Sequence, residues 1–288
     1  MLNTKSARAA TTSRPDEREK YATMSRYFLY LSYDGSRYHG WQVQPNGISV
    51  QEVVERSLST LLGQDIGITA AGRTDAGVNA TVMPVHFDLD GSLPMLGTAP
   101  NGETAAHQLC YKLNRILPRD ISANGIATVR PDAHARFSAV SRTYHYHVAL
   151  RKNPFLTRYH LLLPFGVDFA LMNTAAQLLL GTHDFDCFAK AHPDVKTSIC
   201  TVTEARWVQD SDDAWHFEIT ADRFLRNMVR ATVGTLLDVG RGRTGIAALR
   251  EILESRNRCR AGESVKGEAL FLERVEYPAG IFLSPVNS

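Results

Sequence analysis

Alternating side chains predict a strand at residues 26–33, close to the start of the chain. The segment reads RYFLYLSY, an aromatic-rich run whose two alternating sets of side chains are typical of a half-buried strand. Asp34-Gly35 then provides a turn signal. Ser49 and Glu52 have the spacing of a capping box, so a helix is expected to begin there. Its apolar face would be formed by Val53, Val54, Leu58, Leu61 and Leu62.

The same reading of apolar spacing predicts the remaining elements. Further strands are expected at residues 66–70, 83–87, 121–130, 141–150, 201–208, 215–220 and 270–277. Further helices are expected at residues 104–117, 168–180, 223–239 and 246–255, the first of them ended by Pro118. Long helices that alternate with pairs of strands favour an α+β fold with a largely antiparallel sheet over a parallel βαβ design.

Domain organisation follows from where this periodicity starts and changes. Residues 1–24 lack it and carry five basic and three acidic residues, so they are predicted to be a disordered tail. The length of 288 residues suits two lobes or one large domain. We place an N-terminal lobe at residues 25–135 and a C-terminal lobe at residues 136–288.

Composition narrows the class of protein without naming a function. With 44% hydrophobic and 22% charged residues the chain is typical of a soluble globular protein, and no apolar run approaches the roughly 18 residues of a membrane span. Four cysteines without a CxxC pair indicate reduced thiols, a cytoplasmic location and no structural metal. The net charge is only +2, but nine arginines lie within residues 223–260, which fits either a solvated face or nucleic-acid binding.

Glycines surround one carboxylate in the segment AGRTDAGV, residues 71–78. They let backbone and ligand come close to Asp75, and Arg73 would lie on the same side of an extended chain, able to hold a phosphate or a displaced base. An Asx-type turn between two strands gives the same pattern, and such turns are common. The local sequence therefore leaves both interpretations open.

The predicted strand at residues 141–150 carries two further candidates. Tyr144 and Tyr146 would share one face, and His145 and His147 the other. Two histidines in this spacing can bind a metal, but no third ligand stands at a recognisable spacing, so surface histidines are the favoured interpretation. No GxGxxG, Walker or GxSxG motif occurs, which removes the usual dinucleotide, NTPase and hydrolase assignments.

The segment GRTDAGV, residues 72–78, resembles the signature of the tRNA pseudouridine synthases of the TruA family, and further blocks occur in the order of that family. They are Tyr33-Asp34-Gly35 through Gly40-Trp41-Gln42, Leu113-Asn114 with Leu117-Pro118, His134-Ala135-Arg136-Phe137-Ser138-Ala139, Tyr144-His145-Tyr146, Gly181-Thr182-His183-Asp184-Phe185, Met228-Val229-Arg230 with Gly234, and Ala261-Gly262. The resemblance covers about residues 26–278. It implies the pseudouridine synthase fold, with two α/β lobes, a largely antiparallel sheet and a cleft between the lobes.

The resemblance also implies an activity and a role for four residues. The enzyme would be an isomerase that detaches uracil from its ribose, rotates it and rejoins it through carbon 5, with Asp75 as the nucleophile toward sugar or base. Arg73 would support the space left by the flipped uridine. Tyr144 would pack on the uracil as a candidate acceptor of its carbon-5 proton. Arg230 would pair with Asp75. From the pattern alone, Tyr144 would be a core aromatic, and Arg226 and Arg230, one helical turn apart, would snorkel at the edge of the core.

Substrate, partners and cofactors follow from the same resemblance. The substrate would be tRNA, modified at positions 38–40 in the anticodon stem-loop, and the enzyme a homodimer that needs neither cofactor nor metal. A pseudouridine synthase for other RNA sites, or a non-catalytic RNA-binding protein of the same fold, is the alternative. The chain departs from the family at Asn79, usually His, and at residues 263–266, usually a Pro-containing stretch. We expect neither departure to touch the residues assigned to chemistry.

Overall fold

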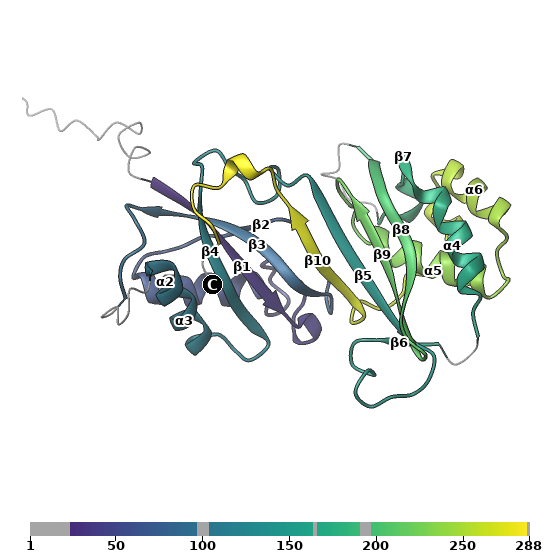
Figure 1. Cartoon of the computed structure of the whole chain (residues 1–288), viewed down its shortest axis with the longest axis horizontal. Helices are drawn as coiled ribbons and strands as arrows, with labels where there is room; N and C mark the ends of the chain where they lie inside the picture. Colours follow the sequence, from purple (N-terminus) through teal and green to yellow (C-terminus); the bar gives the residue numbers. More distant parts are fainter. Residues whose placement is uncertain (1–23, 97–103, 164–165, 191–196, 287–288) are drawn as a thin grey trace, which may run out of the picture.

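A computed structural model describes residues 24–96, 104–163, 166–190 and 197–286, and its centre is one mostly antiparallel sheet (Figure 1). The strands run in the order β4-β1-β3-β10-β5-β9-β8-β7, with β2 paired to β3 and β6 paired to β5. Among the described residues, the pairs β10 with β3 and β5 with β6 are parallel and the other strand pairs are antiparallel. The strands are β1 (Met24–Tyr33), β2 (Thr69–Ala70), β3 (Asn79–Asp90), β4 (Ile121–Val129), β5 (Ser141–Ala149), β6 (Leu161–Leu162), β7 (Gly181–Asp184), β8 (Ile199–Ser211), β9 (Ala214–Ala221) and β10 (Leu270–Glu276). The predicted α+β class is confirmed.

The last strand joins the two halves of the sheet. β10 pairs with β3 on one side and with β5 on the other, although β3 and β5 are distant in sequence from β10. Leu270 packs in the core cluster around β5 and β9, whereas Leu272 packs in the cluster around β1 and β3. Strand β10 is therefore where the two hydrophobic cores meet.

Two helices cover the N-terminal half of the sheet. The first, α2 (Val50–Leu62), begins where the capping box predicts, because Ser49 Oγ accepts a hydrogen bond from the Glu52 amide at 3.2 Å, and it ends at Gly63 with φ of 68°. The second, α3 (Ala105–Ile116), is capped by Thr104 and stops two residues before Pro118. Both bury their apolar faces against the strands of this half.

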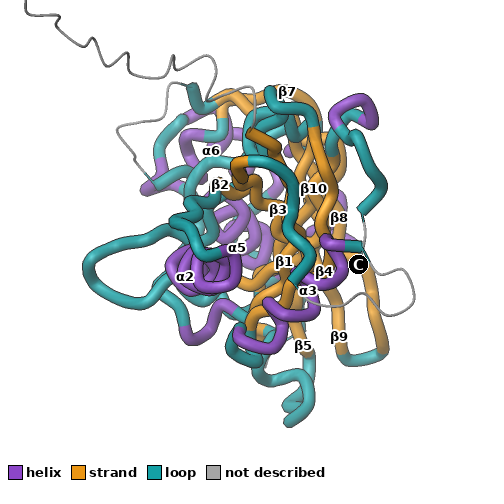
Figure 2. The backbone as a smooth tube through the Cα atoms, turned by 90° about the vertical axis from the view of Figure 1, so that its left-hand side faces the viewer, coloured by secondary structure: helices purple, strands orange, loops and turns teal. Residues whose placement is uncertain are grey.

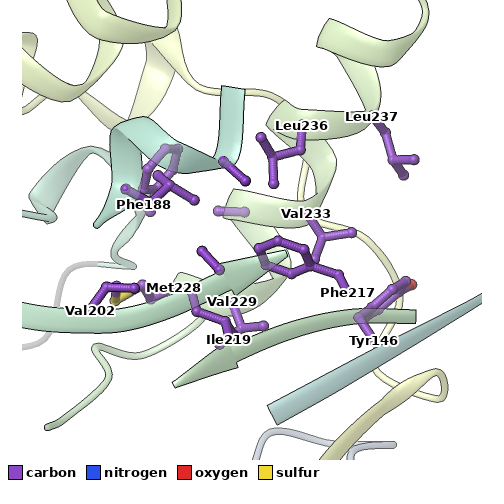
Figure 3. Packing of buried hydrophobic residues seen from close by; sticks show 14 of the residues in the cluster. Tyr146, Phe188, Val202, Phe217, Ile219, Met228, Val229, Val233, Leu236 and Leu237 are labelled. Atoms are coloured by element: carbon purple, nitrogen blue, oxygen red, sulfur yellow. The ribbon is translucent and has the colours of Figure 1, made fainter. Parts of the chain in front are cut away.

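Three helices pack on the C-terminal half: α4 (Phe169–Ala176), α5 (Met228–Gly240) and α6 (Ile246–Ser255). The side chains of α5 are buried around most of its circumference, so it forms the centre of the core shown in Figure 3, where Val233 and Leu236 face Phe217. Seen nearly edge-on in Figure 2, α2, α5 and α6 lie to one side of most of the strands. These three helices pack in one core cluster with Tyr146 of β5 and Phe217 of β9.

The sequence prediction for α5 is wrong at its start. The helix was expected over residues 223–239, but it begins at Met228, because Asn227 adopts the left-handed conformation with φ of 67°. Arg226 therefore precedes the helix and does not lie one helical turn before Arg230. The predicted strand at residues 66–70 is also reduced to β2.

Three expectations about organisation have different outcomes. The predicted tail lies outside the described residues except for Met24, which begins β1. The boundary between lobes at residue 135 stays a prediction. In the part of the chain that the structure describes, no helix has the length and apolar character needed to cross a bilayer.

Candidate active site

The Asp75 loop connects β2 to β3 and is held at several backbone atoms. The Trp41 amide donates to the Thr74 carbonyl at 3.1 Å, and the Tyr33 hydroxyl hydrogen-bonds the Thr74 hydroxyl at 2.9 Å. The Val78 amide donates back to the Asp75 carbonyl at 3.2 Å and closes a tight turn. These bonds fix the backbone on both sides of Asp75, whose side chain is 28% exposed.

Two glycines far from this loop in sequence are required by its close packing. A Cβ at Gly35 would lie 2.0 Å from the Val78 carbonyl oxygen, and one at Gly40, whose φ is 91°, would lie 2.7 Å from the Thr74 carbonyl oxygen. The segment at residues 35–41 thus packs directly against the loop that carries the carboxylate. This explains why the two segments belong to the same set of sequence blocks.

Arg230 and Asp75, 155 positions apart in sequence, form an ion pair. Arg230 Nη1 donates to Asp75 Oδ2 at 3.2 Å, and the Arg230 side chain is 23% exposed. The more exposed Arg226 also reaches the carboxylate, with its Nε 3.8 Å from Asp75 Oδ1. The two guanidinium groups approach different oxygens, so the carboxylate is flanked by positive charge on both sides.

A segment near the C-terminus positions Arg230. Its Nε donates to the Val265 carbonyl at 2.7 Å, and the Val265 amide donates to the Arg230 carbonyl at 3.2 Å. A Cβ at Gly234 would lie 1.8 Å from the Glu263 carbonyl oxygen, so only glycine lets the segment come this close to α5. Arg230 therefore divides its donors between Val265 and Asp75. The expectation that residues 263–266 touch no residue assigned to chemistry is wrong.

Asn79, the other departure from the family pattern, is buried at 1% exposure. Its amide oxygen accepts a hydrogen bond from the Gly35 amide at 2.9 Å, and its amide nitrogen donates to the Glu268 carbonyl at 2.8 Å. The residue links two backbone segments next to the Asp75 loop. Its role is structural in these contacts.

Tyr144 lies on β5 on the helix side of the sheet, packed edge-on against Phe224 with 5.0 Å between ring centroids. Burial raises the pKa of its phenol to about 12, with the Asp75 charge contributing in the same direction. At pH 7 roughly one such phenol in 10⁵ is ionised. The ring is therefore a neutral aromatic surface close to the Asp75 carboxylate.

Additional arginines surround the loop. Arg73, on the loop itself, is exposed. Burial lowers the pKa of Arg136, and the charges of Arg73 and Arg223 lower it in the same direction, so both lie near Arg136. A group of guanidinium groups of this kind is typical of a surface that binds a polyanion. Arg142 was missed by sequence reasoning. It donates to the Ala71 carbonyl at 3.2 Å, and only its position two residues before Tyr144 could have pointed to it.

Groups that could hold a metal lie on the other side of β5. His145 and His147 approach side chains from β9 and β10, among them His216 and Glu273. These histidines alternate along β5 with Tyr144 and Tyr146 and so point to the opposite face of the sheet.

Comparisons with known proteins agree with one another. A family model described as tRNA pseudouridine synthase matches residues 175–278. The chain is 50% identical over 260 residues to tRNA pseudouridine synthase A of Bacteroides fragilis, which covers 90% of this chain and 99% of that protein. It is 50% identical over 261 residues to tRNA pseudouridine synthase A of Porphyromonas gingivalis, covering 90% and 100%. The protein of the same name from Acetivibrio thermocellus is 37% identical over 251 residues, covering 86% and 98%.

Proposed function

The chain belongs to the tRNA pseudouridine synthase A family, and on this premise we propose that Asp75 is the nucleophile that starts the conversion of uridine to pseudouridine. The protein is an isomerase acting on tRNA. The observation that carries the residue assignment is the 3.2 Å ion pair between Arg230 and Asp75, which brings two distant sequence blocks together at one carboxylate.

The proposed reaction uses a carboxylate as the nucleophile and an aromatic side chain that contacts the uracil. Asp75 attacks the bound uridine and forms a covalent bond to it, and the bond between uracil nitrogen 1 and the ribose breaks. The rotated base then rejoins the ribose through carbon 5, and the bond to Asp75 breaks to release the free carboxylate. Carbon 5 loses a proton and nitrogen 1 gains one, so the product is an isomer of the substrate and no cofactor is consumed. Arg230 and Arg226 place positive charge against the two carboxylate oxygens of Asp75 and orient them.

Tyr144 is proposed as the platform on which the uracil stacks. Its raised pKa keeps the phenol neutral near pH 7, which suits stacking and makes proton removal by a phenolate rare in the free enzyme. A proton-acceptor role would require the bound substrate or Asp75 to change the ionisation of the phenol. Replacement by Phe separates these two roles.

The arginines around the loop are proposed to bind the tRNA backbone. Flipping a uridine out of a helix costs a few kcal/mol, which contacts to flanking phosphates must offset. Arg73 sits on the catalytic loop beside Arg136 and Arg223, and is proposed to support the vacated position. The resemblance to the family places the target in the anticodon stem-loop, at positions 38–40.

A pair of variants tests the proposal with purified protein and a tRNA transcript. Asp75→Asn keeps the shape of the side chain but removes the nucleophile, so pseudouridine formation should be abolished while tRNA affinity stays within about threefold. Asp132→Asn, at an exposed carboxylate that pairs with Arg130, is the matched control and should behave as wild type. Turnover by Asp75→Asn would reject the assignment. Mapping pseudouridine in tRNA from cells lacking the gene identifies the modified positions.

We further propose that the enzyme is a cytoplasmic homodimer, as the family resemblance implies. Light scattering on the full chain, with and without tRNA, tests the assembly. A mass of one chain under both conditions would reject the dimer.

A further inference from the structure

Side chains with metal-binding atoms cluster on the face of β5 that is opposite to Tyr144 and Tyr146. Strand β5 presents His145 and His147, which alternate with the tyrosines that face the core. β9 lies alongside, with His216 opposite His147 in the register. β10 brings Glu273 from the other side, at the point where its register with β5 shifts. The donor atoms of His145, His147 and Glu273 all lie within 4.8 Å of one another.

Ring orientation distinguishes this trio from the neighbouring group of His145, His216 and Glu218. A metal bound to an imidazole lies close to the plane of that ring, so two histidines that share an ion need planes that intersect near it. The rings of His145 and His147 are inclined at 75°, with centroids 6.1 Å apart, and meet this condition. The rings of His145 and His216 are stacked, 4.4 Å apart at 26°, and do not.

We propose that His145, His147 and Glu273 bind a divalent transition-metal ion of the zinc class. Two imidazole nitrogens and a carboxylate oxygen are a known donor set for zinc, with metal–ligand distances of about 2.0–2.2 Å. A tetrahedral ion then needs donors roughly 3.3 Å apart.

The surroundings of the trio favour binding. The Thr81 hydroxyl donates to Glu273 Oε2 at 2.7 Å and orients the carboxylate, as outer partners of metal ligands do.

Such an ion would tie β10 to β5, the junction where the two cores of the protein meet. The expected effect is on stability, because an ion that binds the folded chain alone raises its melting temperature with concentration. Catalysis uses the opposite face of β5. This inference therefore stands independently of the proposed function, and tRNA conversion is a separate readout.

Titration of the full chain, purified without a polyhistidine tag, tests the site. Isothermal titration with ZnCl₂ and with CoCl₂ should give one equivalent bound per chain, and the cobalt complex should absorb in the visible range. His145→Asn, His147→Asn and Glu273→Gln should each weaken binding at least tenfold. MgCl₂, which prefers oxygen ligands, should bind at least tenfold more weakly than ZnCl₂. His39→Asn, an exposed histidine on the N-terminal half, is the matched control and should bind as wild type.

Each outcome decides the proposal. A zinc-dependent rise in melting temperature that is lost in the three variants but kept in His39→Asn supports it. Absence of binding to the wild-type chain overturns it. Binding that survives Glu273→Gln but is lost in Glu218→Gln also overturns it, since the ion would then lie at the stacked His145 and His216 pair.

Discussion

Replacing Arg230 and Arg226 separately should show how strongly each guanidinium supports the Asp75 carboxylate. The first is 23% exposed and makes a hydrogen bond at 3.2 Å, whereas the second is 49% exposed with its Nε at 3.8 Å. Solvent screens the second contact far more than the first. Although both arginines carry the same charge, their replacement should therefore slow conversion to different extents.

The magnitude follows from these contacts. A half-buried, charge-assisted hydrogen bond contributes about 1.5–3 kcal/mol, and an exposed pair at most about 1 kcal/mol. If the full amount is lost from the transition state, Arg230→Ala should slow conversion about 10- to 150-fold, and Arg226→Ala at most about fivefold. Arg230→Lys should react at a rate between those of the wild type and Arg230→Ala, because one ammonium group cannot reproduce the planar geometry that serves both Asp75 and Val265.

The assay is single-turnover conversion of a tRNA transcript, which measures the chemical step without product release. Loss of the Val265 contact should also lower the stability of Arg230→Ala by about 1 kcal/mol, a shift of a few degrees in melting temperature, so rates are compared well below the melting transition. The reasoning is refuted if a folded Arg230→Ala reacts at the wild-type rate, or if both alanine variants lose activity equally.

Three further outcomes follow from the structure. Tyr144→Phe keeps the ring that contacts Phe224, so tRNA affinity should hold within about twofold. The rate of conversion should fall about 10²-fold only if the hydroxyl takes part in proton transfer. Full activity would leave Tyr144 as a stacking platform. Asn79→Ala should lower the free energy of unfolding in urea by about 2 kcal/mol, because it leaves the Gly35 amide without its acceptor, and Asn79→His should lower it less; equal stability in Asn79→Ala would contradict this. Burial lowers the pKa of His86 to about 4, so the unfolded chain takes up a proton between about pH 6.5 and 4 that the folded chain does not. As the pH is lowered across that window, the free energy of unfolding should therefore decrease by about 3 kcal/mol at most. In urea unfolding, the free energy of His86→Gln should depend less steeply on pH.

Helices and strands were predictable from the sequence where a capping pair or a clear side-chain periodicity marked them. The capping pair Ser49 and Glu52 located the start of α2, and the two-residue alternation in β5 separated Tyr144 from His145. These signals arise within a few residues and need no knowledge of the fold. Helix α5 shows where they fail. Apolar spacing continues back to residue 223, but the left-handed backbone at Asn227 ends the helix, and periodicity carries no information on that conformation.

Only the tertiary structure decided how distant segments meet. The insertion of β10 between β3 and β5 places Glu273 beside His145 and His147, and the segment that precedes β10 brings the Val265 carbonyl to Arg230. Neither contact has a spacing signal in the chain, because the partners are more than 30 residues apart and one of them is a backbone atom. The contact of Arg230 with Asp75 was expected from family resemblance alone. Arg230 makes one hydrogen bond to Asp75, through Nη1, and its Nε donates to the Val265 carbonyl instead. This division follows from the packing of residues 263–265 against α5.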